Sequence, residues 1–210
     1  MKPFLFSSLF ILSSLLSNVS LAQAPAPSSS KKLVVLGDSL TEGYGVAKDA
    51  AYPALLEKKL HEAGKKNWTV INSGVSGSTT ASAISRMKWI FKSKPDVVLL
   101  ALGANDGLRG IDVKASQKNL SEAIEFAQKQ NVKVILAGLY MPPNYGKDYT
   151  EEFKQMYSSL AKKYKLTLIP FLLDKVAGDP KQNLVDGIHP NESGHKIIAE
   201  TVFKNVQGAL

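Results

Sequence analysis

The stretch Leu33-Val34-Val35-Leu36-Gly37-Asp38-Ser39-Leu40-Thr41-Glu42-Gly43 decides how the chain folds. Four consecutive apolar residues broken by Gly-Asp-Ser predict a buried strand that ends abruptly in a turn. Ligands of an open parallel sheet bind outside the carboxyl ends of its strands. Because Ser39 is the first serine beyond this strand, we expect it to face a cleft as a nucleophile. A serine hydroxyl is weak alone, so this role requires a base and an oxyanion site.

Downstream of this stretch, strand-like apolar runs alternate with segments of helical periodicity. Strands are expected at residues 68–72, 96–102, 132–138 and 166–170, and helices at 52–64, 79–91, 112–130, 150–164 and 191–206. Between the fourth strand and the next helix, residues 140–149 are expected to form an irregular loop. The alternation predicts one α/β domain, a parallel sheet covered by helices on both faces.

The N-terminus has the pattern of an export signal. Lys2 is followed by an apolar run over residues 4–21 and then by Ala22-Gln23-Ala24. This predicts a signal peptide over residues 1–24, a flexible Pro/Ser-rich linker over 25–32 and a globular domain over 33–210. From this assignment we expect the protein to be periplasmic or secreted. An uncleaved membrane anchor is the alternative, whereas a lipoprotein is excluded because the cleavage site has no cysteine.

Composition narrows the chemistry further. The chain of 210 residues contains no cysteine, which excludes disulfides, thiolate nucleophiles and cysteine-based metal sites. The net charge of +8 comes from lysines spread along the sequence without interleaved aromatics. That pattern favours solvated helix faces over nucleic-acid binding and leaves transient contact with anionic membrane lipid open. We expect a monomer.

The segment Asp186-Gly187-Ile188-His189-Pro190 supplies the candidate base. A glycine between the carboxylate and the histidine permits a turn in which Asp186 fixes the tautomer of His189. The other ring nitrogen is then free for Ser39. The alternative is that Asp186 and His189 only cap the last helix. Because Ser39 lies outside any G-x-S-x-G elbow, an α/β-hydrolase fold is disfavoured.

Three groups could stabilise an oxyanion: the amides of Ser39 and Gly74 and the side-chain NH₂ of Asn105. Each follows a different predicted strand, and the carboxyl ends of neighbouring parallel strands share one edge. Ordinary turn roles are the alternative for Gly74 and Asn105. Asp38 and Asp106, beside the serine and the asparagine, are expected to brace these loops by hydrogen bonds or to serve as plain turn residues.

These motifs together resemble the four ordered blocks of the SGNH (GDSL) hydrolase family. They are Gly37-Asp38-Ser39-Leu40, Gly74, Gly103-Ala104-Asn105-Asp106 and Asp186-Gly187-Ile188-His189-Pro190. Within the family, the chain is most similar to the bacterial periplasmic thioesterase I/protease I/lysophospholipase, or arylesterase, group. Further matches are Gly107-Leu108-Arg109-Gly110, Pro143-Asn144-Tyr145-Gly146 and Pro170-Phe171. One departure is Ala104, where many members of that group carry glycine.

The resemblance implies a flavodoxin-like three-layer fold with strand order 2-1-3-4-5. It also implies catalysis by Ser39, His189 and Asp186, with Ser39, Gly74 and Asn105 as oxyanion donors and no metal or organic cofactor. Lysophospholipids, aryl esters and acyl thioesters are the implied substrates. His61 and His195 fall in no metal-ligand pattern.

An apolar groove for the acyl chain is expected to involve Leu108, Ile111, Pro142 and Tyr145. The alternative is a rigid loop packed on the sheet. Three other functions stay open at this point. A carbohydrate acetylesterase or deacetylase would prefer short acyl groups, a flavin-binding electron carrier would be yellow when purified, and an inactive binding module would resist a fluorophosphonate label.

Overall fold

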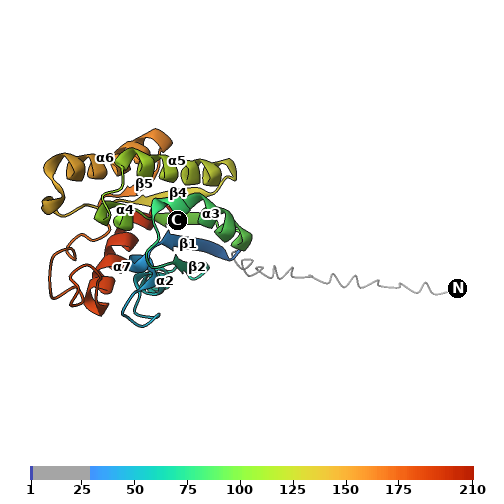
Figure 1. Ribbon diagram of the computed structural model, residues 1–210. Helices are drawn as coiled ribbons and strands as arrows, with labels where there is room; N and C mark the ends of the chain where they lie inside the picture. Colours follow the sequence, from blue (N-terminus) through green and yellow to red (C-terminus); the bar gives the residue numbers. More distant parts are fainter. Residues whose placement is uncertain (2–28) are drawn as a thin grey trace.

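The computed structural model describes Met1 and residues 29–210, so the predicted signal peptide, apart from Met1, and residues 25–28 of the predicted linker lie outside the described residues. Lys31 and Lys32, which the sequence assigned to the linker, already belong to the first strand. A five-stranded parallel sheet forms the centre, in the order β2-β1-β3-β4-β5, as expected. Its strands are β1 Lys31–Gly37, β2 Trp68–Gly74, β3 Val97–Ala101, β4 Lys133–Ala137 and β5 Thr167–Ile169. Helices lie on both faces of the sheet, which gives the predicted three layers (Figure 1).

Two helices cover one face of the sheet and three cover the other. On one side, α2 (Tyr52–Glu62) packs against α7 (Glu192–Val206). On the opposite side, α5 (Val113–Lys129) packs between α3 (Ala83–Ile90) and α6 (Lys147–Tyr164) (Figure 1). No helix within residues 29–210 is long and apolar enough to span a bilayer.

Two short helices were not expected from the sequence. They are α1 (Ser39–Glu42), which follows β1, and α4 (Ala104–Leu108), which follows β3. The segment predicted as one helix over 79–91 begins with a 3-10 turn, η1 (Thr80–Ser82), and Phe91–Ser93 forms another, η2. A third, η3 (Pro143–Tyr145), lies in the loop expected to be irregular. Helices of about one turn show too little periodicity to be detected from sequence.

Strand β1 is the buried centre of the sheet. The side chains of residues 33–36 are at most 1% exposed, because β2 and β3 flank the strand and helices cover both faces. Burying such side chains stabilises a fold by about 1.5–3 kcal/mol each. In the register, Gly37 pairs with Gly74 on one side and with Ala101 on the other. The loops after β1, β2 and β3 therefore begin at the same level of the sheet.

Candidate active site

Ser39 is the first residue of α1 and lies directly beyond β1. The chain folds back tightly at this point, because a Cβ on Gly37 would lie 1.9 Å from Oγ1 of Thr41. Nε2 of His189 lies 3.0 Å from Oγ of Ser39, and Nδ1 of the same ring lies 2.8 Å from Oδ2 of Asp186. The structure thus brings together the three residues that the sequence singled out.

A tight turn holds Asp186 against His189. Oδ1 of Asp186 accepts hydrogen bonds from the amides of Ile188 and His189, both at 3.0 Å, and Gly187 has a φ of +73°. The hydrogen bonds to His189 lower the pKa of Asp186 to about 2. Its carboxylate stays ionised near neutral pH, so Nδ1 of His189 donates to it and Nε2 is left to accept from Ser39. Asn191, and not Asp186, caps α7.

Asn105 and Ser39 both line the pocket in front of the serine. One N–H of the Asn105 amide donates to the carbonyl of Ser78 at 3.1 Å, which leaves its second N–H for a ligand. The Ser39 amide, at the start of α1, has no acceptor within residues 29–210. Both groups are available as donors to an oxyanion.

Gly74 is not brought to this pocket. Its amide donates to Oδ1 of Asn72 at 2.9 Å, and the residue does not line the cavity beside Ser39. A Cβ at this position would lie 2.1 Å from the amide nitrogen of Glu42, so glycine is required there for α1 to approach β2. Of the three oxyanion donors expected from the sequence, Gly74 therefore has to be replaced by a different backbone donor.

Gly77 meets the geometric requirements that Gly74 does not. It lines the pocket with Ser39 and Asn105, and its φ is +75°. The amides of Ser76 and Ser78 on either side both have acceptors, whereas that of Gly77 has none in the described part of the chain. In the sequence, Gly77 is visible only as a second glycine three residues after Gly74 in the same loop. The spacing of the two glycines does not indicate which amide faces the pocket.

Asp106 joins the elements around Asn105. The buried carboxylate accepts hydrogen bonds from the amide and hydroxyl of Thr80, at 2.9 and 2.5 Å, and from the hydroxyl of Ser116 at 3.1 Å. It thereby connects α4 to η1 and α5. These are the bracing contacts that the sequence suggested for this residue.

Asp38 is buried directly behind the nucleophile. Its Oδ1 accepts from the amide of Leu40 at 3.0 Å, and its Oδ2 has no partner in the part of the protein that is described. Burial raises the pKa of Asp38 to about 6. Arg86 is the neighbouring cation. It donates to the carbonyl of Gly37, the last residue of β1, and to that of Ser73, the last but one of β2.

The raised pKa of Asp38 predicts an unusual pH dependence of stability. The folded state disfavours the carboxylate, so stability falls as pH rises from about 3.8 to about 6. Asp38→Asn removes this effect. Its free energy of unfolding should therefore rise by about 2–3 kcal/mol relative to that of wild type as pH increases from 4 to 7. Urea denaturation of both proteins across this range measures the difference. A difference that stays constant with pH would contradict the assignment.

A cavity of about 450 Å³ extends from Ser39 and His189. Its wall is mostly apolar and includes Leu108, Leu139, Met141, Pro142, Leu173 and Ile188. Leu108 and Pro142 are two of the four residues predicted to bind substrate.

Ile111 and Tyr145, the other two predicted residues, do not line the cavity. Instead, the hydroxyl of Tyr145 donates to the carbonyl of Leu108 at 3.1 Å, and that of Tyr149 donates to the carbonyl of Ile111 at 2.9 Å. These contacts fix the backbone behind the pocket wall.

Tyr44 was missed by the sequence reasoning. Its ring lines the cavity with its centroid 4.6 Å from that of His189, in a loop without periodicity.

The two remaining histidines lie outside this pocket. His195 is buried, accepts from the amide of Tyr52 at 3.3 Å, and has its pKa lowered to about 4 by burial. Nε2 of His61 lies 2.8 Å from the carbonyl of Trp68. Over residues 29–210, no group of three or more His, Asp or Glu side chains is placed to hold a metal ion.

A serine hydroxyl next to an imidazole that is oriented by a carboxylate, at the carboxyl end of a parallel sheet, defines a serine hydrolase on a flavodoxin-like fold. Comparison with known proteins agrees. Residues 35–197 match the GDSL-like lipase/acylhydrolase family, and the chain belongs to this family. It is therefore a carboxylic ester hydrolase, and neither a flavin-binding carrier nor an inactive module.

Individual relatives cover most of the chain. The arylesterase of Vibrio mimicus is 40% identical over 182 residues, which span 86% of this chain and 90% of the relative. The thioesterase 1/protease 1/lysophospholipase L1 of Escherichia coli K12 is 35% identical over 176 residues, 83% of each chain. The crystal structure of TesA superposes with a TM-score of 0.82 at 35% identity and covers 86% of this chain and all of that one.

Proposed function

We propose that Ser39, His189 and Asp186 hydrolyse acyl esters and thioesters through a covalent acyl-Ser39 intermediate. The observation that carries the proposal is the pair of contacts at 3.0 and 2.8 Å that links the three side chains. His189 accepts the hydroxyl proton as Oγ attacks the acyl carbon, and then delivers it to the departing alcohol or thiol. Water then attacks the acyl carbon of the intermediate while His189 accepts its proton. The proton passes to Oγ of Ser39 as the carboxylic acid leaves.

The negative charge of each tetrahedral intermediate is held by the amides of Ser39 and Gly77 and by the Asn105 side chain. Donors fixed before the reaction are the largest single contribution in many enzymes, because no reorganisation is needed as the charge develops. Asn105 is fixed through Ser78 and, by way of Asp106, through Thr80. No metal or organic cofactor takes part in this mechanism.

The substrate class is inferred from the cavity. At about 450 Å³ with an apolar wall, the cavity fits an acyl chain better than an acetyl group. Lysophospholipids and aryl esters are the proposed substrates, with acyl thioesters accepted as well, because the site makes no specific contact that would select the leaving group. The names of the arylesterase and thioesterase/lysophospholipase relatives support this range.

We also propose that the enzyme acts outside the cytoplasm. Residues 1–24 have the charged start, apolar run and Ala22-Gln23-Ala24 ending of a signal peptide. The mature enzyme would be a periplasmic or secreted monomer that begins with the linker over residues 25–32. Because acyl-CoA is scarce in that location, lipid esters are the more suitable natural substrates.

Leu108→Ala tests the acyl pocket, and Ile111→Ala is its matched control. Leu108 lines the cavity and Ile111 does not, although they lie three residues apart. Leu108→Ala should lower kcat/KM for a p-nitrophenyl octanoate by about 10-fold and for the acetate by less than about 3-fold. Ile111→Ala should leave the ratio of the two substrates unchanged. Wild-type enzyme that prefers the acetate throughout a chain-length series would instead indicate a carbohydrate acetylesterase.

A further inference from the structure

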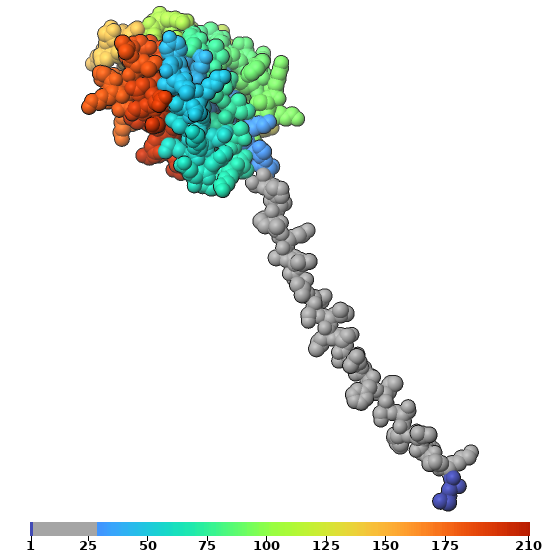
Figure 2. Space-filling view, turned by 90° about the horizontal axis from the view of Figure 1, so that it is seen from below, coloured from blue at the N-terminus to red at the C-terminus, as the bar shows by residue number. Residues whose placement is uncertain are grey.

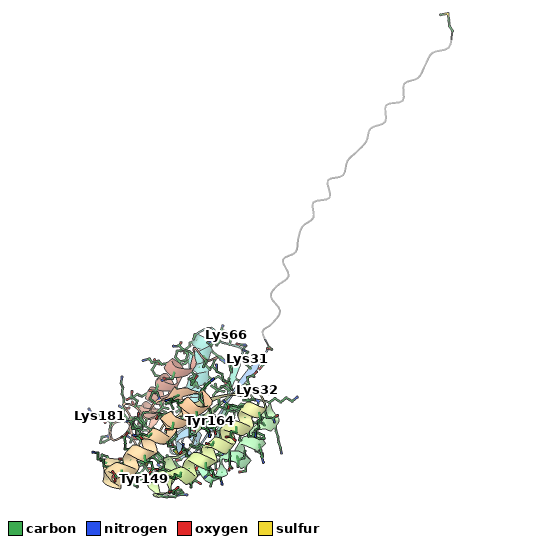
Figure 3. All side chains as sticks on the ribbon, turned by 90° about the horizontal axis from the view of Figure 1, so that it is seen from above. Lys31, Lys32, Lys66, Tyr149, Tyr164 and Lys181 are labelled. Carbon is green, nitrogen blue, oxygen red and sulfur yellow. The ribbon has the colours of Figure 1, made fainter. Side chains whose placement is uncertain are left out.

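Lysines collect at the amino end of the sheet, opposite the active site. We call this surface the basic pole and define it by the lysines that precede or begin the five strands. They are Lys31, Lys32, Lys65, Lys66, Lys92, Lys94, Lys129, Lys133, Lys162, Lys163 and Lys165. In Figure 3, Lys31, Lys32 and Lys66 lie near the start of the described domain, far from Lys181 and Tyr149. The lysines that are scattered in sequence therefore converge in the fold.

The basic pole carries the entire net positive charge of the described residues. Its eleven lysines are accompanied by three acidic side chains, those of Glu62, Asp96 and Glu125. In the rest of residues 29–210, basic and acidic side chains are nearly balanced, with 14 Lys and Arg against 15 Asp and Glu. The field of the protein is thus strongly polarised along the direction of the strands.

Most of this charge is free to meet a partner. Eight of the eleven lysines are exposed, and none forms an ion pair with a carboxylate within residues 29–210. Helices also end at this pole, and a lysine in a last helical turn offsets the helix dipole. That explanation fits Lys129 and Lys162, but Lys31 and Lys133 begin strands and Lys66 lies in a loop.

The position of the first strand favours a membrane as the partner. β1 begins at Lys31 within the basic pole, and the first described residues of the domain, in blue, lie at its edge (Figure 2). In the sequence, an apolar run over residues 4–21 precedes them. This step rests on the export proposed above: as the exported chain leaves the membrane behind the apolar run, this end of the domain is the part nearest the lipid surface.

Of the aromatic rings near the pole, Trp68 is buried and Tyr164 is half-buried, whereas Trp89, in the last turn of α3, is 65% exposed. A single exposed ring does not form the series of stacking platforms on which single-stranded nucleic acids bind.

We propose that the basic pole docks on the anionic headgroups of a phospholipid bilayer, with the active site at the opposite end facing away. Basic residues near an anionic membrane each strengthen binding several-fold, and the attraction decays within a Debye length. In this orientation the enzyme stays at the membrane while its cavity receives esters from the aqueous side. The proposal is independent of which esters the enzyme hydrolyses.

Cosedimentation of the proposed mature enzyme, residues 25–210, with phosphatidylglycerol vesicles tests the proposal, because the apolar run over residues 4–21 would itself insert into a vesicle. The variant K66Q/K129Q/K162Q removes three exposed pole lysines, and K58Q/K114Q/K196Q removes three exposed lysines that lie outside the pole as a charge-matched control. The pole variant should bind about 100-fold more weakly than wild type and the control by much less. Wild-type binding should also be lost at 0.5 M NaCl, and vesicle-bound enzyme should hydrolyse a soluble p-nitrophenyl ester at the free rate.

Three results would overturn the proposal. Equal weakening by the two variants would show that net charge, and not the pole, is responsible. Binding that persists with phosphatidylcholine vesicles and in high salt would indicate apolar insertion instead. Binding to a DNA duplex without binding to anionic vesicles would assign the pole to a polyanion. Both variants should retain wild-type esterase activity in solution, which separates this test from that of the catalytic mechanism.

Discussion

Ser39→Ala should lower kcat for p-nitrophenyl butyrate by about 10⁶-fold, as expected for loss of a catalytic serine. The substitution removes the only atom that can form the acyl-enzyme, whereas oxyanion donors and pocket remain and account for the residual rate. Folding should be unaffected, because within residues 29–210 the Ser39 hydroxyl hydrogen-bonds only to His189, and the cap of α1 is a hydrogen bond from the amide of Leu40 to Asp38.

Ser158→Ala provides the matched control for this variant. Ser158 lies on the exposed face of α6, where its hydroxyl bonds to the carbonyl of Gln155. It should have wild-type kcat, and urea denaturation should give both variants a free energy of unfolding within about 1 kcal/mol of wild type. A folded Ser39→Ala enzyme that retains substantial activity would remove Ser39 as the nucleophile.

His189→Ala should lower kcat near neutral pH by an amount similar to Ser39→Ala, about 10⁵–10⁶-fold, because serine and histidine act as one unit. Its signature should differ in pH dependence. Without the imidazole, only hydroxide can remove the proton of Ser39, so the residual rate should rise about 10-fold for each pH unit. Ser39→Ala, which lacks the nucleophile, should not recover in this way. A pH–rate profile of both variants makes the comparison.

His61→Ala is the control for the loss of an imidazole. His61 belongs to α2 and contacts the carbonyl of Trp68, at the amino end of the sheet. Its kcat should equal that of wild type. If His189→Ala retained more than a few per cent of the activity at neutral pH, another group would have to be the base.

The sequence was sufficient for the parts of the protein that depend on pattern and order. The apolar run before Ser39 and its repeats along the chain predicted the sheet, and the Asp186–His189 spacing predicted a turn that reaches the serine. These features are local, or follow from the rule that neighbouring parallel strands end at one edge. The structure agrees on both.

The choice between Gly74 and Gly77 was decided by atomic packing that spacing does not encode. The sequence analysis named Gly74 alone, but its amide donates to Asn72 and its missing side chain makes room for α1. The roles of Ile111 and Tyr145 were misjudged for a similar reason, because their contacts are with the backbone behind the cavity. A residue in a short loop can face the pocket or support it, and composition does not distinguish the two.

The basic pole is another feature that could not be predicted from the sequence alone. Its lysines occur in small groups that are 26 to 35 positions apart in the sequence, so the sequence alone suggests an even distribution of charge. They meet because the helices run antiparallel to the strands, which places every helix-to-strand connection at the same end. Only the topology reveals that the remaining surface is nearly neutral.

Covalent trapping tests the proposed mechanism most directly. Diethyl p-nitrophenyl phosphate reacts with an activated serine to form a bond between Oγ and phosphorus, with release of nitrophenolate. Peptide mass spectrometry of the inactivated wild-type enzyme should find the diethylphosphoryl group on Ser39, with no adduct in Ser39→Ala and a much slower reaction in His189→Ala. Complete inactivation with the label on a different residue, and Ser39 unmodified, would contradict the mechanism.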